Sequence, residues 1–186
     1  SPFIDENGDK YLFFCHDLGG GGTSHYNTST IWGMKMIDWH TPDYSTVAKL
    51  TETGKTKVTG GDDIREGNVN EAPFMIKNNG KYYLTFSVYS YTDKLYQVRQ
   101  AIADSPLGEY TKVALQDGGT VIAAEAQSDF MSGTGHHSFI KAGDENFIMY
   151  HAHVDRTTGG GQRAIAADRY TFVNNGTQDV IQANGP

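Results

Sequence analysis

The sequence predicts an all-β fold, and three observations support that prediction. The chain has 186 residues, with 22 glycines, only 5 prolines and 12% aromatic residues, a composition that suits strands joined by many turns. A pattern of strand, short polar turn and second strand occurs three times along the chain. No segment shows a convincing apolar period of 3.6 residues, so amphipathic helices are not expected.

The repeated pattern is a hairpin whose copies align on Phe3, Phe74 and Phe139. Phe74 follows Phe3 by 71 residues, and Phe139 follows Phe74 by 65 residues. Self-similarity at such a period is typical of repeat architectures. The three hairpins cover residues 1–14, 70–86 and 136–151.

A third strand is predicted after each hairpin, beyond a loop rich in glycine, serine and threonine. These third strands run from Thr30 to Asp38, from Tyr96 to Ala103 and from Arg163 to Tyr170. A fourth strand can follow, for example from Tyr110 to Ala114. Four strands per repeat is the content of a propeller blade. We therefore expect a single partial β-propeller domain over 1–186, with approximate blades 1–66, 67–130 and 131–186.

The number and the length of the repeats both bear on how the protein is organised. Three blades are fewer than the roughly four to eight that close a propeller, so we expect N-terminal blades to lie outside this chain. The repeat is also longer than the roughly 40–45 residues of a WD-type blade. Its loops must therefore be long, and long loops on a rigid scaffold often carry binding sites.

Charge and hydropathy argue against two classes of partner. The net charge is −7 and no cluster of lysine and arginine occurs, which argues against nucleic acid because phosphates require basic patches. No run approaches the roughly 18 apolar residues of a membrane span. A neutral ligand such as a carbohydrate is compatible with both observations. Cys15 is the single cysteine, and its apolar surroundings favour packing over a catalytic thiol.

The heads of the repeated hairpins carry the candidate chemistry. Glu71 and His136 occupy the same position of the repeat, three residues before the aligned phenylalanine. The first strand of each blade lines the central channel of a propeller, so we expect Glu71 and His136 to be near neighbours. The alternative for Glu71 is an ordinary solvated carboxylate.

The hairpin that begins at Asn70 resembles a known enzyme segment. Its sequence, Asn-Glu-Ala-Pro-Phe-Met-Ile-Lys-Asn-Asn-Gly-Lys-Tyr-Tyr-Leu-Thr-Phe-Ser over 70–87, is similar to the general-acid segment of glycoside hydrolase family 43. Members of that family are five-bladed propellers that act on arabinose- and xylose-containing polysaccharides. Three further stretches resemble the family in order: 1–14, 96–110 with its Ser-Pro-Leu-Gly turn, and 133–151 with its Gly-His-x-Ser motif.

The resemblance implies an inverting mechanism with Glu71 as the general acid. That role requires a carboxyl kept protonated by partial burial and a nearby negative charge. The acid and the base of an inverting site stand roughly 6.5–9.5 Å apart. The family's base and tuning aspartates precede the segment that matches Ser1, so we expect this chain alone to be catalytically incomplete. Asp5, Asp62 and Asp63 are weak substitutes, because they fall in a turn or a polar loop.

The remaining candidate residues also follow from the resemblance. His136 matches a histidine at the propeller axis, which implies a central calcium or sodium ion; the alternative is a histidine hydrogen-bonded in the channel. Arg163 matches an arginine that reaches the sugar, and a solvated arginine is its alternative. Tyr91, Phe86 and Ser87 flank the loop after the acid hairpin and are candidates for substrate binding, although core packing is the stronger expectation for Phe86.

The resulting hypothesis is a glycoside hydrolase that cleaves α-L-arabinofuranosyl or β-D-xylosyl linkages in plant polysaccharides. The alternatives are a non-catalytic carbohydrate-binding propeller and a structural propeller of the WD type. No organic cofactor is expected, and the missing propeller part is the expected partner. Polymer-degrading members are usually exported, which implies a secreted or periplasmic protein. Glu66 lacks the Ala-Pro-Phe that follows Glu71, and we expect it to be exposed.

Overall fold

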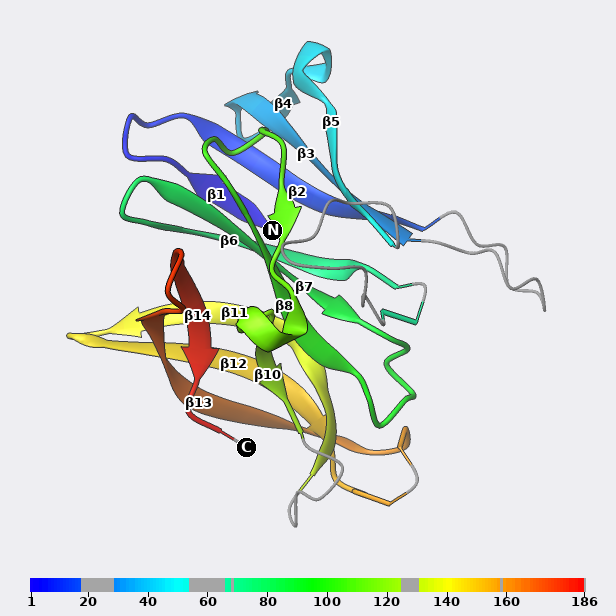
Figure 1. The fold of residues 1–186 in the computed structure, drawn as a ribbon. Helices are drawn as coiled ribbons and strands as arrows, with labels where there is room; N and C mark the ends of the chain where they lie inside the picture. Colours follow the sequence, from blue (N-terminus) through cyan, green and yellow to red (C-terminus); the bar gives the residue numbers. More distant parts are fainter. Residues whose placement is uncertain (18–28, 54–65, 68, 125–130, 158, 186) are drawn as a thin grey trace.

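The computed structural model describes residues 1–17, 29–53, 66–67, 69–124, 131–157 and 159–185. These residues form three antiparallel sheets (Figure 1). The first sheet contains β1 (Pro2–Ile4), β2 (Lys10–Asp17), β3 (Ser29–Asp38), β4 (Thr41–Pro42) and β5 (Ala48–Glu52). The second contains β6 (Glu71–Asn78), β7 (Lys81–Val88), β8 (Gln97–Ala103), β9 (Thr111–Lys112) and β10 (Thr120–Ala123). The third contains β11 (Ser132–Ala142), β12 (Glu145–His153), β13 (Arg163–Asn174) and β14 (Asp179–Ala183).

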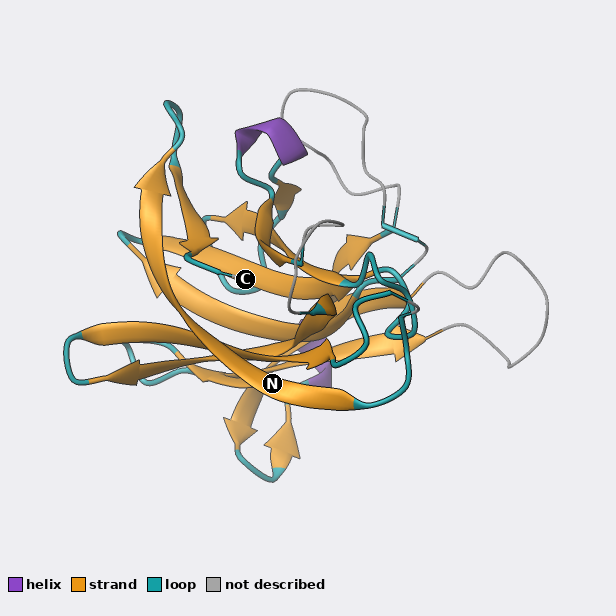
Figure 2. Ribbon diagram, turned by 90° about the horizontal axis from the view of Figure 1, so that it is seen from below, coloured by secondary structure: helices purple, strands orange, loops and turns teal. Residues whose placement is uncertain are grey.

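Helical structure is limited to two short turns in the part of the chain that is described. They are η1 (Tyr44–Thr46) and η2 (Leu115–Asp117), and both lie in connections between strands (Figure 2). Neither of them is long and apolar enough to cross a membrane. The expectation of an all-β fold made of antiparallel blades is confirmed.

Each sheet is a meander that begins with one of the repeated hairpins. β1 pairs with β2, β6 with β7, and β11 with β12, and the predicted third strands are β3, β8 and β13. The fourth position differs from expectation in the first two sheets, where two short strands share it. β4 pairs with one end of β3 and β5 with the other, and β9 and β10 divide β8 in the same way.

The β6–β7 hairpin shows how local sequence sets the register. Asn78 pairs with Lys81, which leaves a two-residue turn of Asn79 and Gly80. Both turn residues have positive φ, 49° and 75°, and Asn-Gly favours this turn because both residues tolerate that conformation. A slip of one residue would turn every side chain to the opposite face. The turn therefore helps to fix which residues of β6 face the neighbouring sheets.

The hairpin strand β6 lies at the centre of the described structure. It is adjacent to β2 of the first sheet and to β11 of the third, as Figure 1 also shows. One apolar cluster joins the first two sheets, with Phe13, Ile31, Leu84 and Phe86 fully buried. A second cluster joins the last two sheets through Val98, Ile148 and Ile181. The sheets thus pack face to face in chain order, and their first strands lie side by side.

Candidate active site

Glu71 is the first residue of β6, and a bulge separates it from the regular part of the strand. The pairing with β7 shifts register between Glu71 and Phe74, and Ala72 has a positive φ of 49°. Pro73 lies in this interval and has no N–H to donate to the ladder, so a bulge is where a strand tolerates it. Bulges commonly re-aim a side chain at the edge of a sheet. Local sequence therefore separates the Glu71–Ser87 pair from the regular ladder of β6.

The hydroxyl group of Tyr96 holds the carboxyl group of Glu71. The Tyr96 hydroxyl donates to Glu71 Oε1 at 2.6 Å, and the Tyr96 side chain is fully buried just before β8. Burial, reinforced by the hydrogen bond to Glu71, raises the pKa of Tyr96 far above its usual range. The hydroxyl group consequently stays protonated and remains a donor, which fixes one oxygen of the carboxyl group.

The backbone of the third sheet approaches Tyr96 closely. A Cβ atom at Gly135 would lie 2.2 Å from Tyr96 Cε1, so this position requires glycine. The next residue, His136, has a positive φ of 52°, and the β11–β12 register shifts around it. Two neighbouring strand heads therefore depart from regular pairing at the same place in the fold.

Glu71 and His136 share neighbours, as the repeat predicts. Ser87 is the cross-strand partner of Glu71, and its Oγ accepts a hydrogen bond from the His136 N–H at 2.8 Å. His151 stacks on Tyr96 with ring centroids 5.4 Å apart and on His136 with centroids 6.2 Å apart. A carboxyl group, a phenol and two imidazoles thus surround the start of β6.

Burial lowers the basicity of His151. Its pKa falls to about 4, first because burial disfavours the charged ring and then because Arg163, His136 and His153 add positive charge. The imidazole of His151 is therefore neutral above this pH. Its Nε2 atom is buried, so His151 packs against Tyr96 instead of facing open solvent with both nitrogens.

Arg163 and Tyr91 lie together at the rim of this region. The guanidinium carbon of Arg163, the first residue of β13, is 5.2 Å from the centroid of the Tyr91 ring. Tyr91 is 52% exposed, and Arg163 is exposed as well. The buried His153 ties down the loop beneath them, because its Nε2 bonds to the Tyr91 carbonyl oxygen at 2.7 Å. Both side chains are available to a ligand.

This geometry can be compared with known proteins. The model of glycosyl hydrolases family 43 matches residues 1–178. The chain belongs to glycosyl hydrolase family 43. The solved structures that it resembles include a family 43 enzyme.

Individual relatives show how much of a longer protein the chain matches. The chain is 29% identical over 187 residues to the beta-D-galactofuranosidase xynD of Aspergillus niger, covering 98% of this chain and 44% of that protein. A thermostable family-43 glycoside hydrolase superposes with a TM-score of 0.82 at 26% identity, covering 100% of this chain and 57% of that one. An endo-1,4-beta-xylanase from Bacteroides thetaiotaomicron gives 0.78 at 25% identity, with the same two coverages. The chain thus spans about half the length of these relatives.

Two of the expected substrate-binding residues require correction. Phe86 and Ser87 have no exposed surface. Phe86 packs in the apolar cluster between the first two sheets, and Ser87 accepts the His136 N–H. Neither side chain can touch a sugar. Both residues belong to β7, which is buried on both of its faces. Successive side chains point to opposite faces of a strand, but neither face of β7 is exposed here.

The other candidate carboxylates that the structure describes, Glu66 and Asp5, have structural roles. Glu66 is 3% exposed and forms an ion pair with Lys112 at 2.7 Å, so the expectation that it is exposed is wrong. Asp5 is 9% exposed and accepts hydrogen bonds from Lys77 and Tyr82. Burial alone would raise the pKa of Asp5, but these hydrogen bonds lower it. Asp62 and Asp63 lie outside the described residues.

Sequence reasoning did not identify Tyr96 or His151 as members of the site. Tyr96 was expected only as the first residue of a strand, and His151 only as the last residue of the third hairpin. The close approach that Gly135 permits is the one signal in the sequence, since glycine beside a histidine at a strand head suggests that another group packs there. Which group packs there depends on the arrangement of the sheets.

Proposed function

We propose that Glu71 is the general acid of an inverting glycosidase that cleaves α-L-arabinofuranosyl or β-D-xylosyl linkages in plant polysaccharides. The observation that carries this proposal is the bulged head of β6, where the buried Tyr96 hydroxyl holds Glu71 Oε1 at 2.6 Å. A general acid must be held within hydrogen-bond reach of the atom that it protonates. Tyr96 restricts the carboxyl group to one orientation and leaves its second oxygen to carry the proton.

The remaining carboxylates of the reaction belong, in this proposal, to propeller blades outside the chain. Glu71 protonates the departing glycosidic oxygen while a base carboxylate activates water on the opposite face of the sugar. The two groups then stand roughly 6.5–9.5 Å apart, which leaves room for the water molecule. The chain contributes the acid, and the rest of the propeller contributes the base and a tuning aspartate.

Arg163 and Tyr91 supply the sugar contacts in this proposal. The fixed fork of donors on a guanidinium group suits recognition of hydroxyl groups, and the exposed ring of Tyr91 offers an apolar face. The Aspergillus niger relative is a beta-D-galactofuranosidase. Galactofuranose and arabinofuranose are both five-membered rings, which supports a furanoside substrate over a xyloside.

A central calcium or sodium ion near His136 forms part of the same proposal. The described residues contain no group of three or more His, Cys, Asp or Glu side chains that could hold a metal ion. Hard cations prefer oxygen ligands, so His136 would orient water around the ion, and other blades would complete its shell. Because polymeric substrates lie outside cells, we further propose that the enzyme is secreted or periplasmic.

The decisive test is Glu71→Gln in the complete enzyme. General acid catalysis contributes about 10²–10⁴-fold, and we expect kcat/KM to fall by about 10³-fold on phenyl or alkyl glycosides. Hydrolysis of a dinitrophenyl glycoside should fall less than about ten-fold, because its leaving group departs without a proton. The matched control is Glu109→Gln, which removes an exposed carboxylate in the connection between β8 and β9 of the same sheet.

Equal losses on both classes of substrate would contradict the acid role. Binding of arabinan without any hydrolysis by the complete protein would instead identify a carbohydrate-binding propeller.

A further inference from the structure

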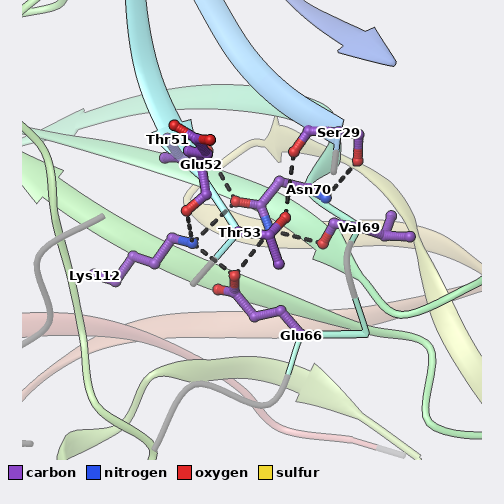
Figure 3. A network of polar contacts seen from close by, with 8 residues as sticks. All are labelled: Ser29, Thr51, Glu52, Thr53, Glu66, Val69, Asn70 and Lys112. Atoms are coloured by element: carbon purple, nitrogen blue, oxygen red, sulfur yellow. Dashed lines mark hydrogen bonds and ion pairs between the residues drawn. The ribbon is translucent and has the colours of Figure 1, made fainter. Parts of the chain in front are cut away.

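Asn70, the residue before Glu71, lies at the centre of a buried polar network (Figure 3). Its side chain and backbone are entirely buried. The Asn70 N–H donates to Ser29 Oγ at 2.7 Å. Its Oδ1 accepts from Thr51 Oγ1 at 3.0 Å and from Lys112 Nζ at 3.0 Å. Its Nδ2 donates to Glu66 Oε2 at 3.1 Å and to the Val69 carbonyl oxygen at 2.7 Å.

The partners of Asn70 come from two different sheets. Ser29 begins β3 and Thr51 lies in β5, both in the first sheet, while Lys112 ends β9 in the second. Cys15 of β2 adds a contact, since its Sγ donates to the Asn70 carbonyl oxygen at 3.3 Å. Asn70 is thus held between the two sheets through its side chain, its backbone N–H and its backbone carbonyl oxygen.

The charged pair within the network completes this clamp. Lys112 Nζ lies 2.7 Å from Glu66 Oε2, and both side chains are 2% exposed. Lys112 also donates to the Glu52 carbonyl oxygen at 3.2 Å. Burial of two charges loses their hydration, so a buried ion pair contributes little net stability compared with apolar residues of similar volume. Its presence next to Asn70 is better explained by orientation than by stability.

Glu71 pairs with Ser87, but the bulge that follows separates this pair from the regular part of β6, so a further anchor on the preceding residue helps to place it. The register shift between Glu71 and Phe74 interrupts the ladder, and the positive φ of Ala72 turns the chain away from regular β geometry. Tyr96 fixes the carboxyl end of the Glu71 side chain. Asn70 fixes the backbone end.

We propose that Asn70 is a positioning residue for the reaction at Glu71, acting through the Glu66–Lys112 pair and the hydroxyl groups of Ser29 and Thr51. This inference rests on the proposed function of Glu71 as the acid. Asn70 itself touches no substrate, because it has no exposed surface. Loss of the anchor should misplace the proton donor while leaving the sugar contacts in place.

The test compares Asn70→Ala with Gln100→Ala in the complete enzyme. Gln100 is an equally buried amide that donates to the Gly118 and Ile181 carbonyl oxygens and accepts the Ile181 N–H. Its bonds reach β14 instead of the head of β6. We expect Asn70→Ala to lower kcat/KM on phenyl glycosides about ten- to a hundred-fold and on dinitrophenyl glycosides less than about three-fold, with KM little changed. Gln100→Ala should affect both substrates equally.

Equal losses on both substrates for Asn70→Ala would overturn the positioning role. If Asn70→Ala does not fold, Thr51→Val provides the test, because it removes one hydrogen bond to Asn70 Oδ1 with little change in side-chain shape. A selective loss on phenyl glycosides then supports the role, and an equal loss overturns it. If Glu71→Gln shows the selective loss and Asn70→Ala does not, the acid role of Glu71 is supported and the positioning role of Asn70 is refuted. Absence of selectivity in Glu71→Gln would refute both.

Discussion

Glu66 and Glu71 are five residues apart, yet the fold gives them opposite surroundings. Glu66 is buried against Lys112 and Asn70 between two sheets. Glu71 is only partly buried, at the bulged start of β6, with the neutral hydroxyl of Tyr96 on one oxygen. The positive charge of Lys112 compensates the first carboxylate, whereas the hydrogen bond from Tyr96 orients the second.

The difference separates a carboxylate that supports the fold from one that is suited to chemistry. A buried charge persists only with a partner that neutralises it, and such a partner blocks access by a substrate. A reacting carboxyl group needs a fixed orientation and an open approach. The same contrast recurs in the adjacent histidines, since His136 is exposed while His137 is buried with its Nε2 2.6 Å from Thr85 Oγ1.

The largest expected effect concerns the buried carboxylate, Glu66. Lys112→Met removes the cation and leaves the Glu66 carboxylate buried without compensation, which should lower the free energy of unfolding by about 3–5 kcal/mol. Denaturant unfolding of the complete protein measures this. The double variant Glu66→Gln with Lys112→Met removes both charges and should recover most of the loss. If the Lys112→Met protein is as stable as the parent, Lys112 does not provide the charge that compensates buried Glu66.

A smaller effect is expected for the partly buried carboxyl group, Glu71. Tyr96→Phe removes the hydrogen bond that orients the Glu71 carboxyl group, and misplacing a catalytic group by about 1 Å can cost about 100-fold, so kcat/KM on phenyl glycosides should fall at least about ten-fold. Water can replace the hydroxyl beside the partly exposed carboxyl group, and stability should change little. The control is Tyr110→Phe, which removes a buried hydroxyl that donates to the Pro106 carbonyl oxygen. If both variants lose stability and neither loses activity, Tyr96 belongs with the structural residues.

The smallest effect concerns pH and the buried histidine. Burial, with a contribution from His136, lowers the pKa of His137 from 6.5 to about 3. Between these values the unfolded chain binds a proton that the folded protein does not, so stability is lost as the pH falls from 6.5 toward 3. At pH 5.5 this loss amounts to about 1 kcal/mol.

The measurement compares unfolding free energies at pH 7.5 and 5.5 in the parent, His137→Gln and Thr85→Val. The glutamine variant should lose about 1 kcal/mol less on acidification. Thr85→Val breaks the same hydrogen bond but retains the buried imidazole, so its pH dependence should match that of the parent. An unchanged pH dependence in His137→Gln would show that another group titrates.

Much of the architecture could be predicted from local sequence. The hairpins follow from alternating apolar residues around polar turns, and Asn79 and Gly80 specify their turn directly. The third strands were predicted within one or two residues at their starts. The fourth strands were less predictable, since the outer edge of a blade is short and is held mainly by its pairing with β3 or β8.

The candidate site was only partly predictable, for a physical reason. Repetition placed Glu71 and His136 at equivalent strand heads, and the sequence motif around Glu71 indicated an acid. Burial of a polar side chain, in contrast, depends on a partner that can lie far along the chain. Glu66 looked like an exposed carboxylate because Lys112, 46 residues away, is its compensating charge.

The sequence by itself determined the repeated hairpins, their turns and the family, because these depend on residues close together in the chain. Only the tertiary structure decided that Tyr96 holds Glu71, that Phe86 and Ser87 are inaccessible, and that Asn70 is clamped between two sheets. These contacts join residues from different strands and sheets. Their existence depends on how the sheets pack, since packing determines which polar groups lose water and must find partners within the protein.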